Sequence, residues 1–102
     1  MGIIMKFNEL KKLLEEKNNF IITTHVNPDA DAIGSEIAVY YILKKLNKSV
    51  KIINYSETPY FLQFLDKERK IEQYEPSRHN KLFSENGVII VVDMNQLSRT
   101  VK

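Results

Sequence analysis

The 102-residue chain contains no cysteine and no tryptophan, and it has only three glycines and three prolines. The absence of cysteine excludes disulfide bonds and thiolate metal sites, and it is typical of a cytoplasmic protein. The longest uninterrupted aliphatic run, Val88–Val92, is far shorter than the roughly 20 apolar residues of a membrane-spanning helix. The first residues do not match a signal peptide either, because Lys6 interrupts them. We therefore expect a cytoplasmic protein with no membrane partner.

An excess of charge of one sign is also missing. Fifteen Lys and Arg residues against thirteen Asp and Glu residues leave a formal net charge of +2, so charge alone indicates no nucleic-acid or membrane partner. The composition is 43% hydrophobic and 27% charged, which excludes wholesale disorder, a collagen-like chain and low complexity. A chain of this length is expected to form one domain, or part of one.

Apolar residues along the chain alternate between strand and helix periodicity. Phe20–Thr24 and Val88–Asp93 are apolar and rich in β-branched residues, which is typical of buried parallel strands. A strand, a helix and another strand between residues 20 and 54 predict a βαβ unit. Lys67–Asn80 is too polar to assign, and Met94–Lys102 is predicted to be a polar tail. The predicted helices are Asn8–Glu16, Asp31–Leu46, Pro59–Leu65 and a turn at Lys81–Glu85, and the predicted strands are Phe20–Thr24, Val50–Asn54 and Val88–Asp93.

These elements predict an α/β fold, with a doubly wound, mostly parallel sheet and helices on both faces. The sheet is expected to be incomplete at the C-terminus, because no helix follows the last strand and such sheets usually have five or more strands. We expect the front part of a larger domain, or a domain that completes its sheet by association. An exposed sheet edge would favour a homo-oligomer.

Acidic residues and a histidine follow the ends of two predicted strands. His25, Asp29 and Asp31 come after the first strand, and Asp93 ends the third. If these strands are neighbours, the side chains converge, because ligands bind outside the carboxyl ends of parallel strands. Carboxylates with an imidazole suit Mn²⁺, Mg²⁺ or Zn²⁺, and a carboxylate bridging two ions would support attack of a water at phosphorus. Asp29 and Asp31 also precede a helix, so capping is an alternative that the spacing leaves open.

The residues from His25 to Ser35, HVNPDADAIGS, closely resemble the first motif of the DHH phosphoesterase superfamily, in its RecJ-like nano-RNase and pAp phosphatase branch. Val88–Asp93, followed by Ser98–Thr100, resembles the second motif and the loop after it. The resemblance extends from Phe7 to Thr100. The first motif is specific, and the second gains weight from its spacing.

By this resemblance, His25 and Asp29 would hold one Mn²⁺ and Asp31 a second. Asp93 would bridge the two ions, and Mg²⁺ could replace Mn²⁺. The resemblance implies that Asp31 and Asp93 are catalytic, with a water between the ions as the nucleophile. It implies a phosphoester substrate: a short oligonucleotide, 3′-phosphoadenosine 5′-phosphate (pAp) or a related phosphate. Arg99 would lie on a loop over the site, where it could contact a substrate phosphate or be a surface arginine.

The sequence departs from the family pattern after Asp93. It has no Asp-His-His third motif, no fourth acidic motif and no C-terminal substrate-binding domain. We therefore expect residues 1–102 to be the N-terminal portion of a DHH catalytic domain, a phosphoesterase fragment with impaired activity alone. The alternative is a catalytically inactive DHH-like module for interaction or regulation. A receiver-like domain that accepts a phosphoryl group on Asp93 is a third hypothesis.

Residues outside these motifs favour structural interpretations. His79 is expected in a solvated loop, because its neighbours are polar. Tyr55, Tyr60, Phe61 and Phe64 are expected to serve core packing or a domain contact, with base stacking as the alternative.

Overall fold

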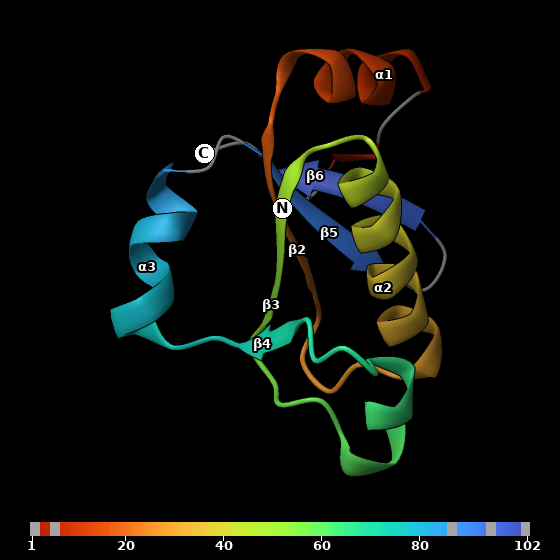
Figure 1. The fold of residues 1–102 in the computed structure, drawn as a ribbon, viewed down its shortest axis with the longest axis vertical. Coiled ribbons are helices and arrows are strands. Elements are labelled where there is room, and N and C mark those ends of the chain that lie inside the picture. The colour runs from red at the N-terminus through yellow and green to blue at the C-terminus, as the bar shows by residue number, and fades with distance from the viewer. Residues whose placement is uncertain (1–2, 5–6, 86–87, 94–95, 101–102) are drawn as a thin grey trace.

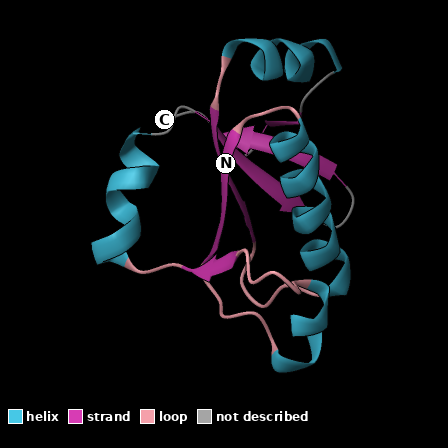
Figure 2. Cartoon of the chain, in the orientation of Figure 1, coloured by secondary structure: helices cyan, strands magenta, loops and turns pink. Residues whose placement is uncertain are grey.

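The computed structural model describes residues 3–4, 7–85, 88–93 and 96–100. In these ranges the chain forms one mixed sheet with helices on either side (Figures 1 and 2). The strands are β1 (Ile3–Ile4), β2 (Asn19–Thr24), β3 (Ser49–Asn54), β4 (Ile71–Gln73), β5 (Val88–Asp93) and β6 (Gln96–Thr100). The helices are α1 (Phe7–Glu16), α2 (Ala30–Lys45), the 3-10 helix η1 (Tyr60–Leu65) and α3 (Pro76–Glu85). No helix of these ranges is long and apolar enough to cross a membrane.

The sheet is parallel in its larger part and antiparallel at one edge. Its strand order is β1-β6-β5-β2-β3-β4. Strands β5, β2, β3 and β4 run parallel to one another, whereas β6 is antiparallel to β5 and β1 is antiparallel to β6. The α/β fold with a mostly parallel sheet is therefore confirmed. The first and third predicted strands, now β2 and β5, are direct neighbours.

Successive residues of the central strands enter two cores on opposite faces of the sheet. Phe20 and Ile22 of β2 lie in the core under α1 and α2, whereas Ile21 lies in the core under α3. A strand buried on both faces must be apolar at successive positions, which explains the uninterrupted apolar runs. The helical residues that complete these cores are Leu13, Leu14, Ile37, Val39, Tyr40 and Leu43 on the first face, and Leu82 and Phe83 on the second.

The predicted polar tail is wrong over its middle part. Gln96–Thr100 forms β6, whose register with β5 runs from Asp93 opposite Gln96 to Ile89 opposite Thr100. Without β6, the backbone N–H and C=O groups along that side of the apolar strand β5 would lack partners. Backbone pairing needs no apolar side chains, so a polar segment serves as well. Residues 94–95 and 101–102 of the predicted tail lie outside the described residues.

The region left unassigned contains a strand and the start of a helix. Ile71–Gln73 forms β4, parallel to β3, and α3 begins at Pro76 rather than at Lys81. Proline suits the first turn of a helix, because the N–H group that it lacks has no intrahelical partner there. The longer helix carries His79 into the protein, so the expectation of a solvated loop histidine is wrong.

Candidate functional site

The carboxyl ends of β2 and β5 lie side by side at one edge of the sheet. Thr24 pairs in register with Val92, so the next residues, His25 and Asp93, follow at the same edge. The buried Thr24 hydroxyl also donates a hydrogen bond of 2.6 Å to the carbonyl oxygen of Val92. This bond joins the two strand ends that carry the predicted ligands. Asp93 is the last residue of β5, and its side chain lies outside the described part of the chain.

The loop between β2 and α2 holds a fixed shape through two local features. Asn27 has a φ of 56°, in the left-handed region that asparagine tolerates better than most residues. Its N–H donates a 3.1 Å hydrogen bond to the hydroxyl of Ser56, in the loop that follows β3. The loops after β2 and β3 are therefore joined, and the buried Pro28 leads directly to Asp29.

His25 is exposed and is oriented by its own neighbour. Its Nδ1 lies 2.9 Å from the carbonyl oxygen of Val26. A carbonyl oxygen only accepts, so Nδ1 is the donor in this bond, and Nε2 is the ring nitrogen left for a metal. A histidine that binds a metal commonly donates its other ring N–H to such an oxygen. The tautomer of His25 therefore fits a metal ligand.

Asp29 is the N-cap of α2, so the capping alternative is correct for this residue. Its Oδ1 accepts a 2.9 Å hydrogen bond from the N–H of Ala32. Capping uses one carboxylate oxygen, and Oδ2 makes no hydrogen bond to the part of the chain that the structure describes. Asp31 lies in the first turn of α2 and is also exposed. Capping therefore leaves carboxylate oxygens of both residues available to a ligand.

The donor types at this edge suit a hard divalent cation, but the structure does not bring the three described side chains together around one point. It consists of the imidazole of His25 and the carboxylates of Asp29 and Asp31, and oxygen donors with imidazole suit Mn²⁺ or Mg²⁺. Within the described side chains, no three His, Asp or Glu residues are close enough to one another to hold an ion. The fourth predicted ligand, Asp93, is at the neighbouring strand end by its backbone. The complete ligand set stays a prediction.

Arg99 lies on a strand rather than on a loop over the site. It belongs to β6, where it is opposite Ile90 of β5 and Ile3 of β1. Its backbone is therefore three strand positions, roughly 10 Å, from the strand end at Asp93. Its side chain is not among those described, so the contact with a substrate phosphate stays a prediction.

A model of the DHH family, N-terminal domain, matches residues 19–102. The chain belongs to the DHH family. It is 38% identical over 84 residues to a bifunctional oligoribonuclease and PAP phosphatase, NrnA, of Thermus thermophilus, a match that covers 78% of this chain and 22% of that protein.

A solved structure resembles the DHH-family chain in fold. It is the crystal structure of an exopolyphosphatase-related protein of Bacteroides fragilis, with a TM-score of 0.72 and 29% sequence identity. The match covers 86% of this chain and 26% of that one. The chain thus spans about a quarter or less of the length of these two proteins. The DHH-family match starts at Asn19, the first residue of β2, so it contains both strand ends of the candidate site.

A buried carboxylic acid near this site was missed in the sequence analysis. Glu36 of α2 is fully buried and accepts a 2.8 Å hydrogen bond from the side-chain N–H of Asn54, the last residue of β3. Burial raises the pKa of Glu36 to about 8, although the bond from Asn54 opposes this and the charge of Asp66 adds to it. A usable signal existed, because Glu36 falls in the helical stripe of Ile33, Tyr40 and Leu43.

His79 is also buried, with both ring nitrogens engaged. Its Nδ1 accepts a 2.8 Å hydrogen bond from the N–H of Glu75, so Nε2 carries the proton that faces Glu72 Oε1 at 3.0 Å. Partial burial alone would raise the pKa of Glu72, but the bond from His79 and the charge of Lys51 together lower it. This pair joins β4 to α3 and has a structural role.

Proposed function

We propose that this chain is the N-terminal part of a cytoplasmic, metal-dependent phosphoesterase that hydrolyses short oligonucleotides or pAp-like nucleotides. The name of the related Thermus thermophilus protein, an oligoribonuclease and PAP phosphatase, supports this substrate class. So does the family membership of the segment that carries the predicted ligands. The observation that carries the proposal is the neighbouring position of the β2 and β5 ends, joined by the bond from Thr24 to Val92.

Each residue of the site would have a defined task. His25 and Asp29 would hold one Mn²⁺, Asp31 the other, and Asp93 would bind both. When bound, such ions lower the pKa of a bound water, and their positive charge stabilises the negative charge of the phosphate. The bond from His25 to Val26 keeps the ring in the tautomer that offers Nε2. The cap from Asp29 to Ala32 fixes that carboxylate at the start of α2, whose positive pole also favours a phosphate.

The metal-binding part of this proposal is tested by calorimetric titration of the full chain with Mn²⁺. The variant Asp29→Asn keeps a side-chain oxygen for the Ala32 N–H but loses the negative charge, so it separates ligation from capping. We expect Asp29→Asn and Asp31→Asn to weaken Mn²⁺ binding by at least about tenfold. Glu85→Gln removes an equal charge from an exposed site at the end of α3 and should leave binding unchanged.

The substrate class is tested in the same titration by adding pAp. Because a phosphate bound at the site would share the ions, pAp should tighten Mn²⁺ binding to the unmodified chain and not to Asp31→Asn. Absence of Mn²⁺ binding would refute the metal-dependent mechanism. Mn²⁺ binding that pAp leaves unchanged would instead favour the inactive interaction module.

A further inference from the structure

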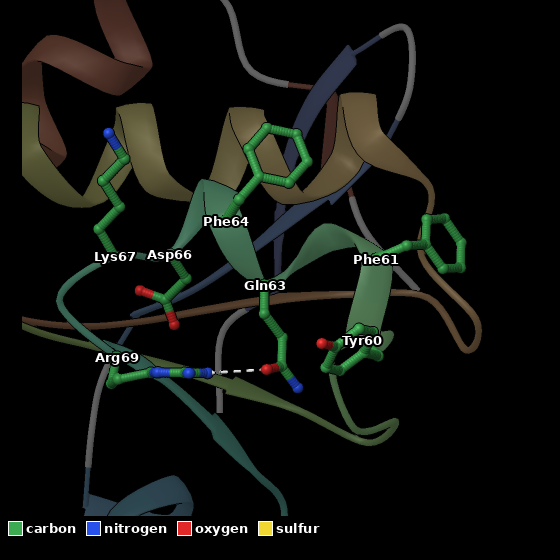
Figure 3. A pocket seen from close by; sticks show the side chains of 7 residues that line it. All are labelled: Tyr60, Phe61, Gln63, Phe64, Asp66, Lys67 and Arg69. Atoms are coloured by element: carbon green, nitrogen blue, oxygen red, sulfur yellow. Dashed lines mark hydrogen bonds between the residues drawn. The ribbon is translucent and has the colours of Figure 1, made fainter.

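An open pocket of about 550 Å³ lies between η1 and the turn that follows it (Figure 3). Aromatic side chains of η1 line it and remain exposed to solvent. The exposed fraction is 88% for Tyr60, 74% for Phe61 and 65% for Phe64. The sequence analysis favoured core packing or a domain contact for these residues and for Tyr55, and core packing is wrong for all four because they are exposed, Tyr55 at 68%. Rings exposed to this extent beside a pocket are typical of a binding surface.

Arg69 extends into this pocket and is held in place by Gln63. Its Nη1 donates a 3.0 Å hydrogen bond to Gln63 Oε1, drawn as a dashed line in Figure 3. Gln63 in turn approaches the carbonyl oxygen of Thr58 through its Nε2, at 3.5 Å. Arg69 also has a φ of 56°, which is uncommon for a long side chain. The hydrogen bond to Gln63 orients the exposed guanidinium toward η1, and its other N–H groups are further donors for a ligand.

The charges around the pocket favour an anion. Lys67 and Arg69 line it together with one carboxylate, that of Asp66. Asp66 is buried and turned into its own turn, where its oxygens accept hydrogen bonds from the N–H groups of Lys70 and Ile71 at 2.8 and 2.9 Å. The carboxylate is thus compensated by backbone donors, and the two cations face the solvent side.

An aromatic ring and the fixed guanidinium share one side of the pocket. Tyr60 and Gln63 are three residues apart on a 3-10 helix, so they lie on the same side of η1, and Arg69 is bonded to Gln63. Figure 3 shows these three side chains together, whereas the rings of Phe61 and Phe64, which also line the pocket, are directed away from the Gln63–Arg69 bond. A ligand that suits them has a flat apolar ring and an anionic group, which a nucleotide combines.

The pocket also lies at the same end of the sheet as the candidate metal site. The helix η1 follows the carboxyl end of β3, and β3 is the parallel neighbour of β2. The bond from Asn27 to Ser56 connects the loop of His25 and Asp29 to the loop before η1. Figure 1 shows η1 and the β2–α2 loop at one end of the molecule.

We propose that this pocket is a subsite for one nucleotide of the substrate, with the base stacked on Tyr60 and a phosphate paired with Arg69. The inference rests on the proposed function, because it assigns the pocket to the substrate of the same site. It adds a binding contribution that does not require the metal. The two proposals can therefore be tested separately.

The test measures ligand binding to the full chain in the presence of EDTA. The chain is titrated with one of three probes, the dinucleotide pApA, adenosine or inorganic phosphate, and its NMR signals are recorded. We expect pApA to bind and to shift the amide signals of residues 57–71. Tyr60→Leu should weaken pApA binding about tenfold, and Tyr60→Phe should keep it, because stacking needs the ring and not the hydroxyl. Arg69→Asn, which tolerates the positive φ, should weaken pApA binding about tenfold and leave adenosine binding unchanged.

Matched controls come from residues outside the pocket. Tyr55→Leu removes a tyrosine that is 68% exposed, and Lys45→Gln removes an exposed cation at the end of α2; neither should change pApA binding. An equal loss of pApA affinity in Tyr60→Leu and Tyr55→Leu would overturn the subsite. So would amide shifts of residues 57–71 that are as large with inorganic phosphate alone as with pApA. If pApA does not bind in EDTA, the Mn²⁺ titration still tests the proposed function. If Mn²⁺ does not bind, the pApA titration in EDTA still tests the subsite. The two negative results are therefore distinguishable.

Discussion

Glu36 and Asn54 form a polar pair inside the protein whose hydrogen bonding is half complete. Glu36 Oε1 accepts from Asn54, whereas Glu36 Oε2 and Asn54 Oδ1 are buried without a partner among the described residues. Both of these oxygens are acceptors when Glu36 is ionised. A proton on Oε2 supplies the donor that is missing, since a carboxylic acid and an amide can bond to each other reciprocally. The raised pKa of Glu36 agrees with this arrangement.

The pair makes stability depend on pH. The folded chain keeps the Glu36 proton up to a pKa of about 8, whereas the unfolded chain releases it near the ordinary value of 4.5. Its contribution is therefore complete below pH 4.5 and is lost as the pH rises to about 8, by up to about 1.4 kcal/mol per pH unit. Glu36→Gln should remove this dependence and be the more stable protein at pH 8. Urea unfolding of both proteins at pH 5, 6.5 and 8 measures the difference, and parallel pH profiles would contradict it.

At the scale of elements, His79 is the buried polar contact between α3 and the sheet, beside the apolar contacts of Leu82 and Phe83 and the exposed Arg78–Glu72 ion pair. His79 accepts from Glu75 at the start of α3 and faces Glu72 of β4, and it is almost fully buried. His79→Ala would leave a cavity and unpaired polar groups, so we expect a loss of about 3 kcal/mol in the free energy of unfolding. Urea unfolding tests this, with Lys81→Ala on the exposed side of the same helix as the control. A loss below about 1 kcal/mol would show that Leu82, Phe83 and Arg78 hold α3 on the sheet without His79.

Strands with a local apolar pattern can be predicted from the sequence, whereas elements placed by distant contacts cannot. Phe20–Thr24 and Val88–Asp93 are apolar on both faces, and that property is local, so both strands were found with their parallel arrangement. The strand β6 has no such local pattern, because its place is set by the free side of β5. His79 was misjudged for a related reason: its polar neighbours concealed a helix that starts at Pro76. The loop between β2 and α2 was expected from its motif, whereas the turn at Arg69, with its positive φ, has no sequence signature.

For the whole molecule, metal binding and folding should be coupled. The predicted ligands come from two strands that are neighbours only in the folded sheet, so an unfolded chain has no assembled site. Free Mn²⁺ at about one hundred times its dissociation constant should raise the free energy of unfolding by about 2.7 kcal/mol. Urea unfolding with Mn²⁺ and with EDTA measures this increase. It should disappear in Asp31→Asn, and an equal increase in that variant would indicate an ion bound elsewhere.

The hydrogen bond from Thr24 to Val92 spans 68 positions of the chain. The pairing of β2 with β3 closes a much shorter segment, through α2, and can form early. Loop-closure entropy grows with length, and contacts between distant segments slow folding, so β5 should join β2 late. During synthesis, the HVNPDAD loop can therefore meet the end of β5 only after residues 88–93 have left the ribosome. We therefore expect the two strand ends of the candidate site to meet only once β5 has paired with β2.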